Sequence, residues 1–179
     1  GDNINRAIER GLGSSEGGLF ETAVYEGYGP HGVAILVEAL TDNKNRTAAE
    51  VRHIFSKHGG NMSGSTAWQF DIKGVIVIAK ADEKAQELAI DRGAEDLEVE
   101  SNVLTIYTAP NALDHVLEAL QSAGYQPEFS QITKIPQLET SLSDRGAAQV
   151  ASMLESFEEL DDVQNVFTTA NFSNLDVVG

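Results

Sequence analysis

The chain contains no cysteine among its 179 residues. This absence excludes disulfide frameworks, thiolate zinc sites and cysteine nucleophiles together, and it is consistent with a reducing compartment. Long apolar runs are absent too, because none approaches the ~18 residues that a membrane-spanning helix needs. The first residues, GDNINRAIER, show neither the apolar segment of a signal peptide nor an initiator Met. We therefore expect a cytoplasmic or organellar protein without membrane contact, whose chain is truncated at its start.

Positive charge is scarce in this sequence. Lys and Arg number 12 against 28 Asp and Glu, which gives a net charge of −16, whereas binding of nucleic acid by bulk electrostatics needs Lys and Arg. The cations are unevenly placed: residues 41–61 carry four against two carboxylates, and residues 82–100 carry two against eight. A mildly basic, Gly-rich face on an acidic body is a candidate contact surface, and the acidic part is most simply a solvated exterior.

Signatures of catalysis are poor. The chain has neither a GxxxxGK(S/T) phosphate loop nor a GxSxG nucleophile elbow. His31 and His115 have no plausible His or Cys companions, so no metal site is predicted. We therefore expect a protein that is not an enzyme, with no catalytic residue, cofactor or metal, although a site assembled from distant residues stays open.

Apolar periodicity predicts alternating strands and helices at the start of the chain. Thr47 with Glu50 three residues later has the form of a capping box, and Gly59 with Gly60 is a typical helix end, so a helix is predicted between them. The turn-rich EGYGPHG is expected to join the first two strands as a hairpin. The expected strands are Leu19–Tyr25, Val33–Leu40 and Ser65–Asp71.

The middle of the chain shows the same alternation twice. Two helical stripes end at Gly93 and Gly124, and Asn111 with Asp114 is expected to cap the second helix. The predicted elements are a strand at Val75–Ala79, a helix at Asp82–Arg92, strands at Leu97–Val99 and Val103–Tyr107, a helix over 113–120 and an extended segment at Tyr125–Ile132. This β-α-β-β-α-β order is the split arrangement called ferredoxin-like.

The tail repeats the alternation, with strands at Ile135–Leu142 and Val163–Thr168 around a helix. The outer segments 33–71 and 135–168 could then complete a second βαββαβ sheet. This predicts an α+β fold of two ferredoxin-like α/β sandwich domains, one inserted in the other. The expected division is a discontinuous domain of residues 14–72 plus 134–179 and an inserted domain of residues 73–133. A single continuous α+β domain is the alternative.

The segment Tyr25–Asn61 is the most distinctive, because polar, Gly-rich clusters bracket one strand and one helix. Its motifs YEGYGP (25–30), LTDNKNRT (40–47) and FSKHGGN (55–61) closely resemble the YebC family, which includes the mitochondrial translational activators of cytochrome c oxidase. The family is described as a basic, helical N-terminal domain followed by two α+β domains. Only residues 2–11 resemble the end of the helical domain. The resemblance therefore implies that residues 1–13 are its remnant and a hinge, and that the domain itself is missing.

The resemblance also implies a gene-expression factor. It would act either as a translation factor that contacts ribosomal RNA or tRNA, or as a DNA-binding transcriptional regulator. Its partners would be RNA or DNA, mainly through the missing N-terminal domain, with the ribosome as a further candidate. Its location would be cytoplasmic, or the mitochondrial or plastid matrix in a eukaryote. The alternative is a protein-interaction or ligand-sensing module without nucleic-acid binding, because the ferredoxin-like fold hosts many functions.

Two groups of residues in these motifs are singled out. Those expected at a nucleic-acid or partner contact can donate hydrogen bonds, carry charge or stack on bases: Tyr25, Tyr28, Asn43, Asn45, Arg46, Lys57, His58 and Asn61. Those expected to set the loop geometry are Gly27, Gly29, Pro30, Gly59 and Gly60. Each has a structural alternative as a turn, a cap or a packing anchor. Because a helix packed on its strand keeps its ends apart, one contact face would combine a single helix end with the EGYGPHG loop.

Overall fold

The computed structural model describes residues 19–172, which form an α+β fold of mainly antiparallel sheets and four helices. The chain divides into two compact units, of which the first contains the residues up to Phe70 and those from Pro136 onward, and the second is Asp71–Ile135. The predicted remnant at residues 1–13 lies outside the described residues. Within the described part, no helix is long and apolar enough to cross a membrane.

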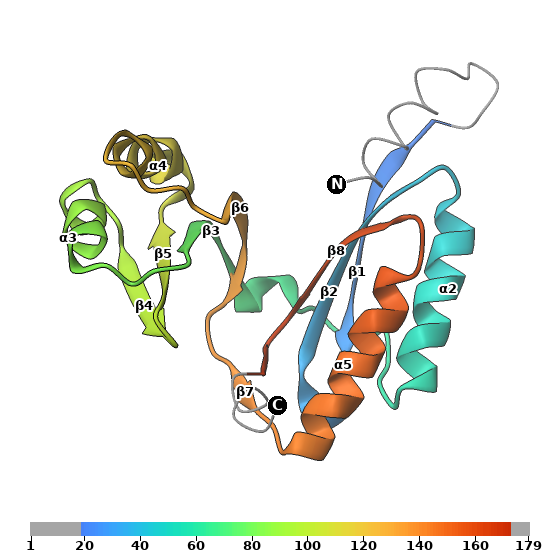
Figure 1. Cartoon of the computed structure of the whole chain (residues 1–179). Helices are drawn as coiled ribbons and strands as arrows, with labels where there is room; N and C mark the ends of the chain where they lie inside the picture. The colour runs from blue at the N-terminus through green and yellow to red at the C-terminus, as the bar shows by residue number, and fades with distance from the viewer. Residues whose placement is uncertain (1–18, 173–179) are drawn as a thin grey trace. The chain divides into compact units, whose positions relative to one another are not determined.

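A three-stranded antiparallel sheet is the centre of the first unit. Its strands are, in spatial order, β1 (Glu21–Tyr28), β2 (Ala34–Thr41) and β8 (Val163–Thr168). The helices α2 (Lys44–Lys57) and α5 (Asp144–Glu158) lie side by side on one face of this sheet (Figure 1). They run in opposite directions, so the C-terminal end of α2 lies beside the N-terminal end of α5. Two short strands, β7 (Thr140–Ser141) and β9 (Ala170–Asn171), form a parallel pair.

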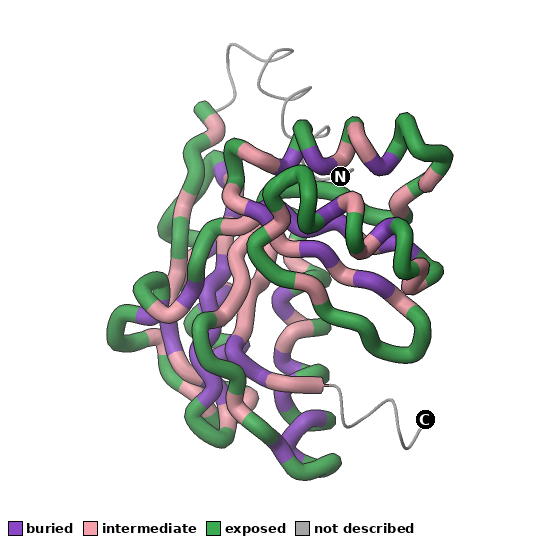
Figure 2. Tube along the Cα trace, turned by 90° about the vertical axis from the view of Figure 1, so that its left-hand side faces the viewer, coloured by how far each residue is buried: buried purple, intermediate pink, exposed green. Residues whose placement is uncertain are grey.

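The middle strand β2 is buried on both sides, and its side chains alternate between two clusters. On the helix side, Ile35 and Val37 belong to the main core, where the rings of Phe55 and Phe157 meet edge to face with centroids 5.1 Å apart. On the other side, Leu36 belongs to a smaller cluster with Ala34 and Phe70. Buried positions accordingly follow the strands and the inward sides of the helices (Figure 2).

The second unit has the predicted order of elements. They are β3 (Phe70–Ile78), α3 (Glu83–Asp91), β4 (Asp96–Glu100), β5 (Val103–Thr108), α4 (Leu113–Ser122) and β6 (Phe129–Pro136). The strands form one sheet in the order β4-β5-β3-β6. Its core contains Ile76, Leu104 and Ile106 from the sheet and Val116 and Leu120 from α4. Apolar patterns identified the first five elements. The last was predicted only as an extended segment at Tyr125–Ile132, and β6 begins and ends four residues later.

The strand predicted at Ser65–Asp71 is wrong. The chain forms the 3₁₀ turn η2 (Ala67–Gln69) there, and β3 begins only at Phe70. The carboxylate of Glu26 explains the difference, because it accepts the N–H groups of Thr66 and Ala67, each at 2.8 Å, and so withdraws both from strand pairing. These hydrogen bonds also lower the pKa of Glu26.

Two consequences follow for the first unit. The tail strand predicted at Ile135–Leu142 is reduced to the two residues of β7, while β6 continues to Pro136. The main sheet of the first unit therefore has three strands, with β1 at one edge, in place of the four expected from the outer segments. The domain boundaries expected after residues 72 and 133 fall within β3 and β6.

The predicted helix caps are also corrected. Helix α2 begins one turn earlier than expected, and its N-cap is Asn43, whose Oδ1 accepts the N–H of Arg46 at 3.0 Å. Thr47 is buried inside the helix, so the predicted capping box does not form. Asn111 does not cap α4 either, because the 3₁₀ turn η3 (Pro110–Ala112) precedes that helix and no side chain caps it.

Candidate functional site

The loop after β1 and the loop after α2 are joined by two backbone hydrogen bonds. The N–H of Tyr28 donates to the carbonyl oxygen of Asn61, and the N–H of Asn61 donates to the carbonyl oxygen of Tyr28, both at 2.9 Å. The EGYGPHG loop and the KHGGN segment, which are distant in the sequence, are therefore adjacent in the fold. The structure thus brings this loop to the C-terminal end of α2.

Glycines permit this close approach. A Cβ on Gly60 would collide with the carbonyl oxygen of Tyr28, and one on Gly27 would collide with the carbonyl oxygen of Asn61. Gly59 has a φ of +79°, the left-handed conformation that commonly ends a helix. The amide of Gly29 donates to the carbonyl oxygen of Val33 at 2.9 Å and closes the turn η1 (Pro30–Gly32).

A recess of about 580 Å³ opens at this end of the two helices, within the usual ~300–1,000 Å³ of ligand pockets. We call it the basic recess. Its lining residues are Pro30, Lys57, His58 and Gly59 from the two motifs and Arg145, Ala148, Gln149 and Ser152 from α5. Among the described residues no carboxylate belongs to this lining, although the whole chain has a net charge of −16.

The α5 side of the basic recess is one polar stripe. Arg145, Gln149 and Ser152 follow each other at spacings of four and three residues, which return to the same side of a helix. The Nε2–H of His31 donates to Oε1 of Gln149 at 2.6 Å and fixes this amide. His31 itself has a φ of +64°, a conformation uncommon outside glycine. Since Oε1 is engaged, the NH₂ group of Gln149 is the donor that a ligand would meet.

His58 is tied to the same helix. The Ser156 hydroxyl donates to the carbonyl oxygen of Ser152 at 3.2 Å, so its oxygen accepts from Nε2–H of His58, also at 3.2 Å. Burial of the imidazole, followed by the charge of Lys57, lowers the pKa of His58 below its ordinary value. At neutral pH the positive charge of the basic recess is therefore carried by Lys57 and Arg145.

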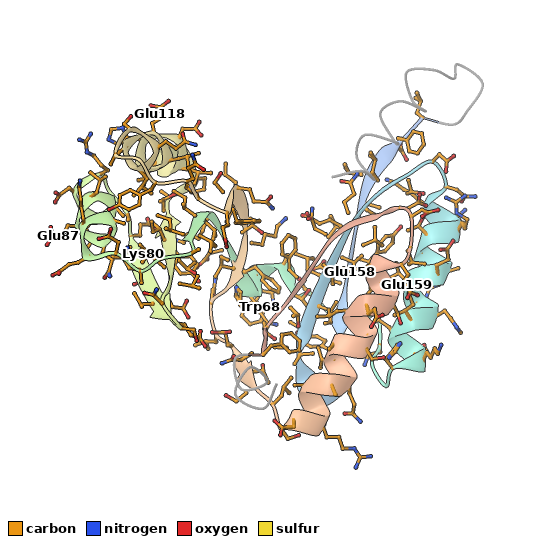
Figure 3. The ribbon with its side chains drawn as sticks, viewed as in Figure 1. Trp68, Lys80, Glu87, Glu118, Glu158 and Glu159 are labelled. Carbon is orange, nitrogen blue, oxygen red and sulfur yellow. The ribbon has the colours of Figure 1, made fainter. Side chains whose placement is uncertain are left out.

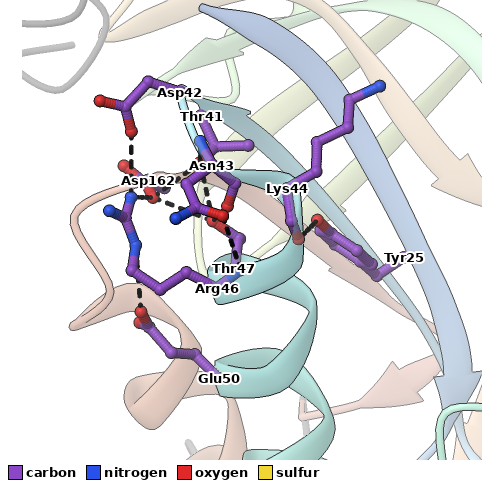
Figure 4. Close-up of polar contacts among 9 residues, drawn as sticks. All are labelled: Tyr25, Thr41, Asp42, Asn43, Lys44, Arg46, Thr47, Glu50 and Asp162. Carbon is purple, nitrogen blue, oxygen red and sulfur yellow. Dashed lines mark hydrogen bonds and ion pairs between the residues drawn. The ribbon is translucent and has the colours of Figure 1, made fainter. Parts of the chain in front are cut away.

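The opposite end of α2 is arranged differently (Figure 4). Arg46 lies 2.6 Å from Oδ2 of Asp162, 3.2 Å from Oδ1 of Asp42 and 3.5 Å from Oε1 of Glu50. One guanidinium thus faces three carboxylates, a group that we call the Arg46 cluster. In residues 19–172 no comparable ion pair involves Lys57 or Arg145.

Asp162 is the centre of the Arg46 cluster. Its side chain is only 11% exposed, and its Oδ2 also lies 3.0 Å from the hydroxyl oxygens of Thr41 and Thr47. Burial alone raises the pKa of this carboxyl. The hydrogen bonds from Arg46, Thr47 and Thr41 outweigh burial, so the pKa of Asp162 lies below its ordinary value. The charge of Arg46 is thereby engaged in holding the start of α2 to the segment before β8.

The structure separates the two tyrosines of the motif. Tyr25 packs against the core under α2, and its hydroxyl donates to the carbonyl oxygen of Lys44 at 3.3 Å. Tyr28 packs against the cluster on the other side of the sheet, and its hydroxyl donates to the carbonyl oxygen of Ser65 at 3.4 Å. Positions three apart on a strand point to opposite faces, so these rings do not form one stacking platform.

The remaining predicted contact residues lie at different ends of α2. Asn43 is engaged as the N-cap, and Asn45 is exposed on the first turn. Asn61 bridges to Tyr28 beside the basic recess. The sequence did not identify Arg145, Gln149 or Ser152, because their role depends on a neighbour about ninety residues earlier in the chain and not on any local motif.

These observations define an α+β protein of two compact units, the first of which carries a cation-lined recess beside a Gly-rich loop. The chain belongs to the TACO1/YebC family, because the family model described as TACO1/YebC second and third domain matches residues 20–170. The resemblance seen in the three motifs is thereby confirmed.

Relatives and a solved structure agree with this assignment. The chain is 49% identical over 173 residues to a probable transcriptional regulatory protein of Deinococcus radiodurans, covering 95% of this chain and 71% of the relative. It is 50% identical over 177 residues to one of Acidithiobacillus ferrooxidans, covering 97% and 71%. The crystal structure of the conserved hypothetical protein Aq1575 from Aquifex aeolicus matches with a TM-score of 0.78 at 43% identity, covering 95% of this chain and 72% of that one.

Proposed function

We propose that this chain is part of a non-enzymatic regulator of gene expression that contacts nucleic acid through the basic recess. The observation that carries the proposal is the lining, which contains Lys57 and Arg145 and, among the described residues, no carboxylate. Such cations bind phosphate oxygens in nucleic-acid complexes. The relatives in Deinococcus radiodurans and Acidithiobacillus ferrooxidans are named probable transcriptional regulatory proteins, which supports the class.

Side chains, and not helix dipoles, supply the attraction. The N-terminal end of α5 favours an anion, but the C-terminal end of α2 beside it disfavours one by a similar amount. The electrostatic contributions of the two helix ends therefore largely cancel. The remaining attraction for a phosphate comes from Lys57 and Arg145, together with the neutral hydrogen-bond donors of Gln149 and Ser152.

RNA fits this surface better than duplex DNA does. The recess is concave, and the cations at the other end of α2 are already paired, Arg46 with its cluster and Lys44 with Glu21 at 3.5 Å. The first turns of α2 therefore present no uncompensated cation to a DNA groove. Sequence-directed RNA recognition mostly targets unpaired nucleotides, which enter pockets. We accordingly favour a translation factor that contacts ribosomal RNA or tRNA, with the DNA-binding regulator as the second candidate that the relatives' names support.

The second unit is proposed to be an inserted ferredoxin-like domain. Its element order and its sheet order β4-β5-β3-β6 support this assignment. Carboxylates dominate its exterior, as Glu87 on α3 and Glu118 on α4 illustrate (Figure 3). We assign nucleic-acid contact to the first unit because the basic recess, whose lining has two cations and no described carboxylate, belongs to it.

The test measures the affinity of the chain for a fluorescein-labelled single-stranded RNA at several salt concentrations, with fluorescence anisotropy as the readout. The double variant Lys57→Ala with Arg145→Ala is expected to lose affinity about tenfold or more, and its salt slope should flatten by about 1.4 if two phosphate contacts are lost. The control is Lys84→Ala with Arg92→Ala, which removes the same charge from exposed positions of the second unit.

Two outcomes would contradict the proposal. Equal loss in both double variants would mean that only net charge matters. Absence of any salt-sensitive binding by the unmodified chain would instead support the alternative, a protein-interaction or ligand-sensing module.

A further inference from the structure

We infer that the basic recess seats one unpaired nucleotide, with its phosphate against Lys57 and Arg145 and its base among Pro30, Ala148 and Gln149; this inference rests on the proposed function. Contact with the phosphate backbone of a nucleic acid alone would need only cations on a surface. The basic recess also has a volume, hydrogen-bond donors and walls that suit a base.

Its size is the first argument. A volume of about 580 Å³ is roughly twenty times the ~30 Å³ share of a single water molecule. A phosphate group occupies only a small part of such a space. A sugar and a base are the parts of a nucleic acid that would occupy the rest.

The polar groups in the recess suit a base edge. Gln side chains bind base edges through their amides, and here Oε1 of Gln149 already accepts from His31. The amide therefore offers N–H donors, with the Ser152 hydroxyl three residues further along the same stripe. Every natural base presents at least one acceptor, so the recess should require a base and tolerate several kinds.

The walls suit the flat faces of a base. The imidazole of His58 is a planar group on which unstacked bases commonly lie, and Pro30 and Ala148 add apolar surface. These groups could reach only a base that is not covered by its neighbours in a duplex. The ligand class is therefore single-stranded or locally extruded nucleic acid.

The experiment compares two labelled oligomers with the same number of phosphates, a single-stranded RNA and its fully abasic counterpart, on the full chain. The natural oligomer should bind about tenfold tighter, since stacking of a base typically adds that much or more. Gln149→Met keeps the size of the side chain but removes its donors, and it should narrow this gap while leaving the abasic oligomer unaffected. Gln121→Met, at an exposed position of α4, is the matched control.

The outcomes separate the inference from the proposed function. Equal binding of natural and abasic oligomers, or an equal loss of both with Gln149→Met, would overturn the nucleotide site. If Lys57→Ala with Arg145→Ala still weakened both oligomers, the proposed phosphate contact would stand. If neither oligomer bound in a salt-sensitive way, both would fail.

Discussion

The two ends of the helix pair α2 and α5 carry similar residues in opposite arrangements. At one end Arg46 is surrounded by three carboxylates, and Glu158 and Glu159 lie on the neighbouring end of α5 (Figure 3). At the other end Lys57 and Arg145 line a recess to which no described carboxylate contributes. Two of the carboxylates around Arg46, Asp42 and Glu50, are local neighbours four residues away, and the third, Asp162, is brought to it by the fold. A cation in a motif is available to a ligand only when neither its local neighbours nor the fold brings it a carboxylate.

The largest effect on stability is expected at the centre of the Arg46 cluster. Asp162→Ala should lower the free energy of unfolding by about 2–3 kcal/mol, because it removes a largely buried carboxylate that accepts hydrogen bonds from Thr41, Thr47 and Arg46 at once. Urea denaturation measures this loss. Glu158→Ala, exposed on α5, is the control and should change stability by less than about 0.5 kcal/mol. Similar values for both variants would show that the cluster is not structural.

The loop that flanks the basic recess depends on Gly60. Gly60→Ala should cost about 2 kcal/mol, because the new Cβ would meet the backbone of Tyr28 and break the bridge to Asn61. Gly59→Ala has open space around its Cβ and should cost only about 1 kcal/mol, for its left-handed backbone. Thermal unfolding compares the two. RNA affinity should fall with Gly60→Ala, because the broken bridge no longer holds the Gly-rich loop beside the basic recess. Unchanged RNA affinity in Gly60→Ala would show that the recess does not depend on this bridge.

Much of the fold is predictable because its signals are local. The hairpin of β1 and β2, the end of α2 at Gly59 and the first five elements of the second unit are marked by local apolar patterns, turns or stop residues. The strand expected at residues 65–71 failed because a carboxylate on another strand, Glu26, captures its amides. The α5 side of the basic recess could not be predicted from the sequence either, because Arg145 and Gln149 acquire their role only when α5 packs beside α2.

A smaller effect is expected from acid titration. The pKa of Asp162 is lower in the fold than its ordinary value, so the folded state binds fewer protons than the unfolded state as this group titrates. The stabilisation is complete above the ordinary Asp pKa of about 3.9 and is lost as the pH falls through the folded value. Measured by urea denaturation, the stability gap between the unmodified chain and Asp162→Asn should therefore narrow below about pH 4. A gap that is constant down to pH 3 would contradict this assignment.

The smallest effect is expected at Arg46. Arg46→Ala should cost about 1 kcal/mol, because the guanidinium is 46% exposed and the largely buried Asp162 keeps its hydrogen bonds from Thr41 and Thr47. RNA affinity should stay within about twofold, since the charge already faces three carboxylates. Denaturation and anisotropy on one preparation give both numbers. If Arg46→Ala lost as much RNA affinity as Lys57→Ala, the RNA contact would include the Arg46 cluster, which would contradict its assignment to the basic recess.

The most direct test of the central claim is ultraviolet crosslinking of the chain to single-stranded RNA, with the crosslinked peptides identified by mass spectrometry. The account predicts crosslinks in peptides that contain residues 57–61 and residues 145–152, which line or flank the basic recess. Crosslinks confined to residues 42–50, at the Arg46 cluster, or to residues 71–135 would contradict it.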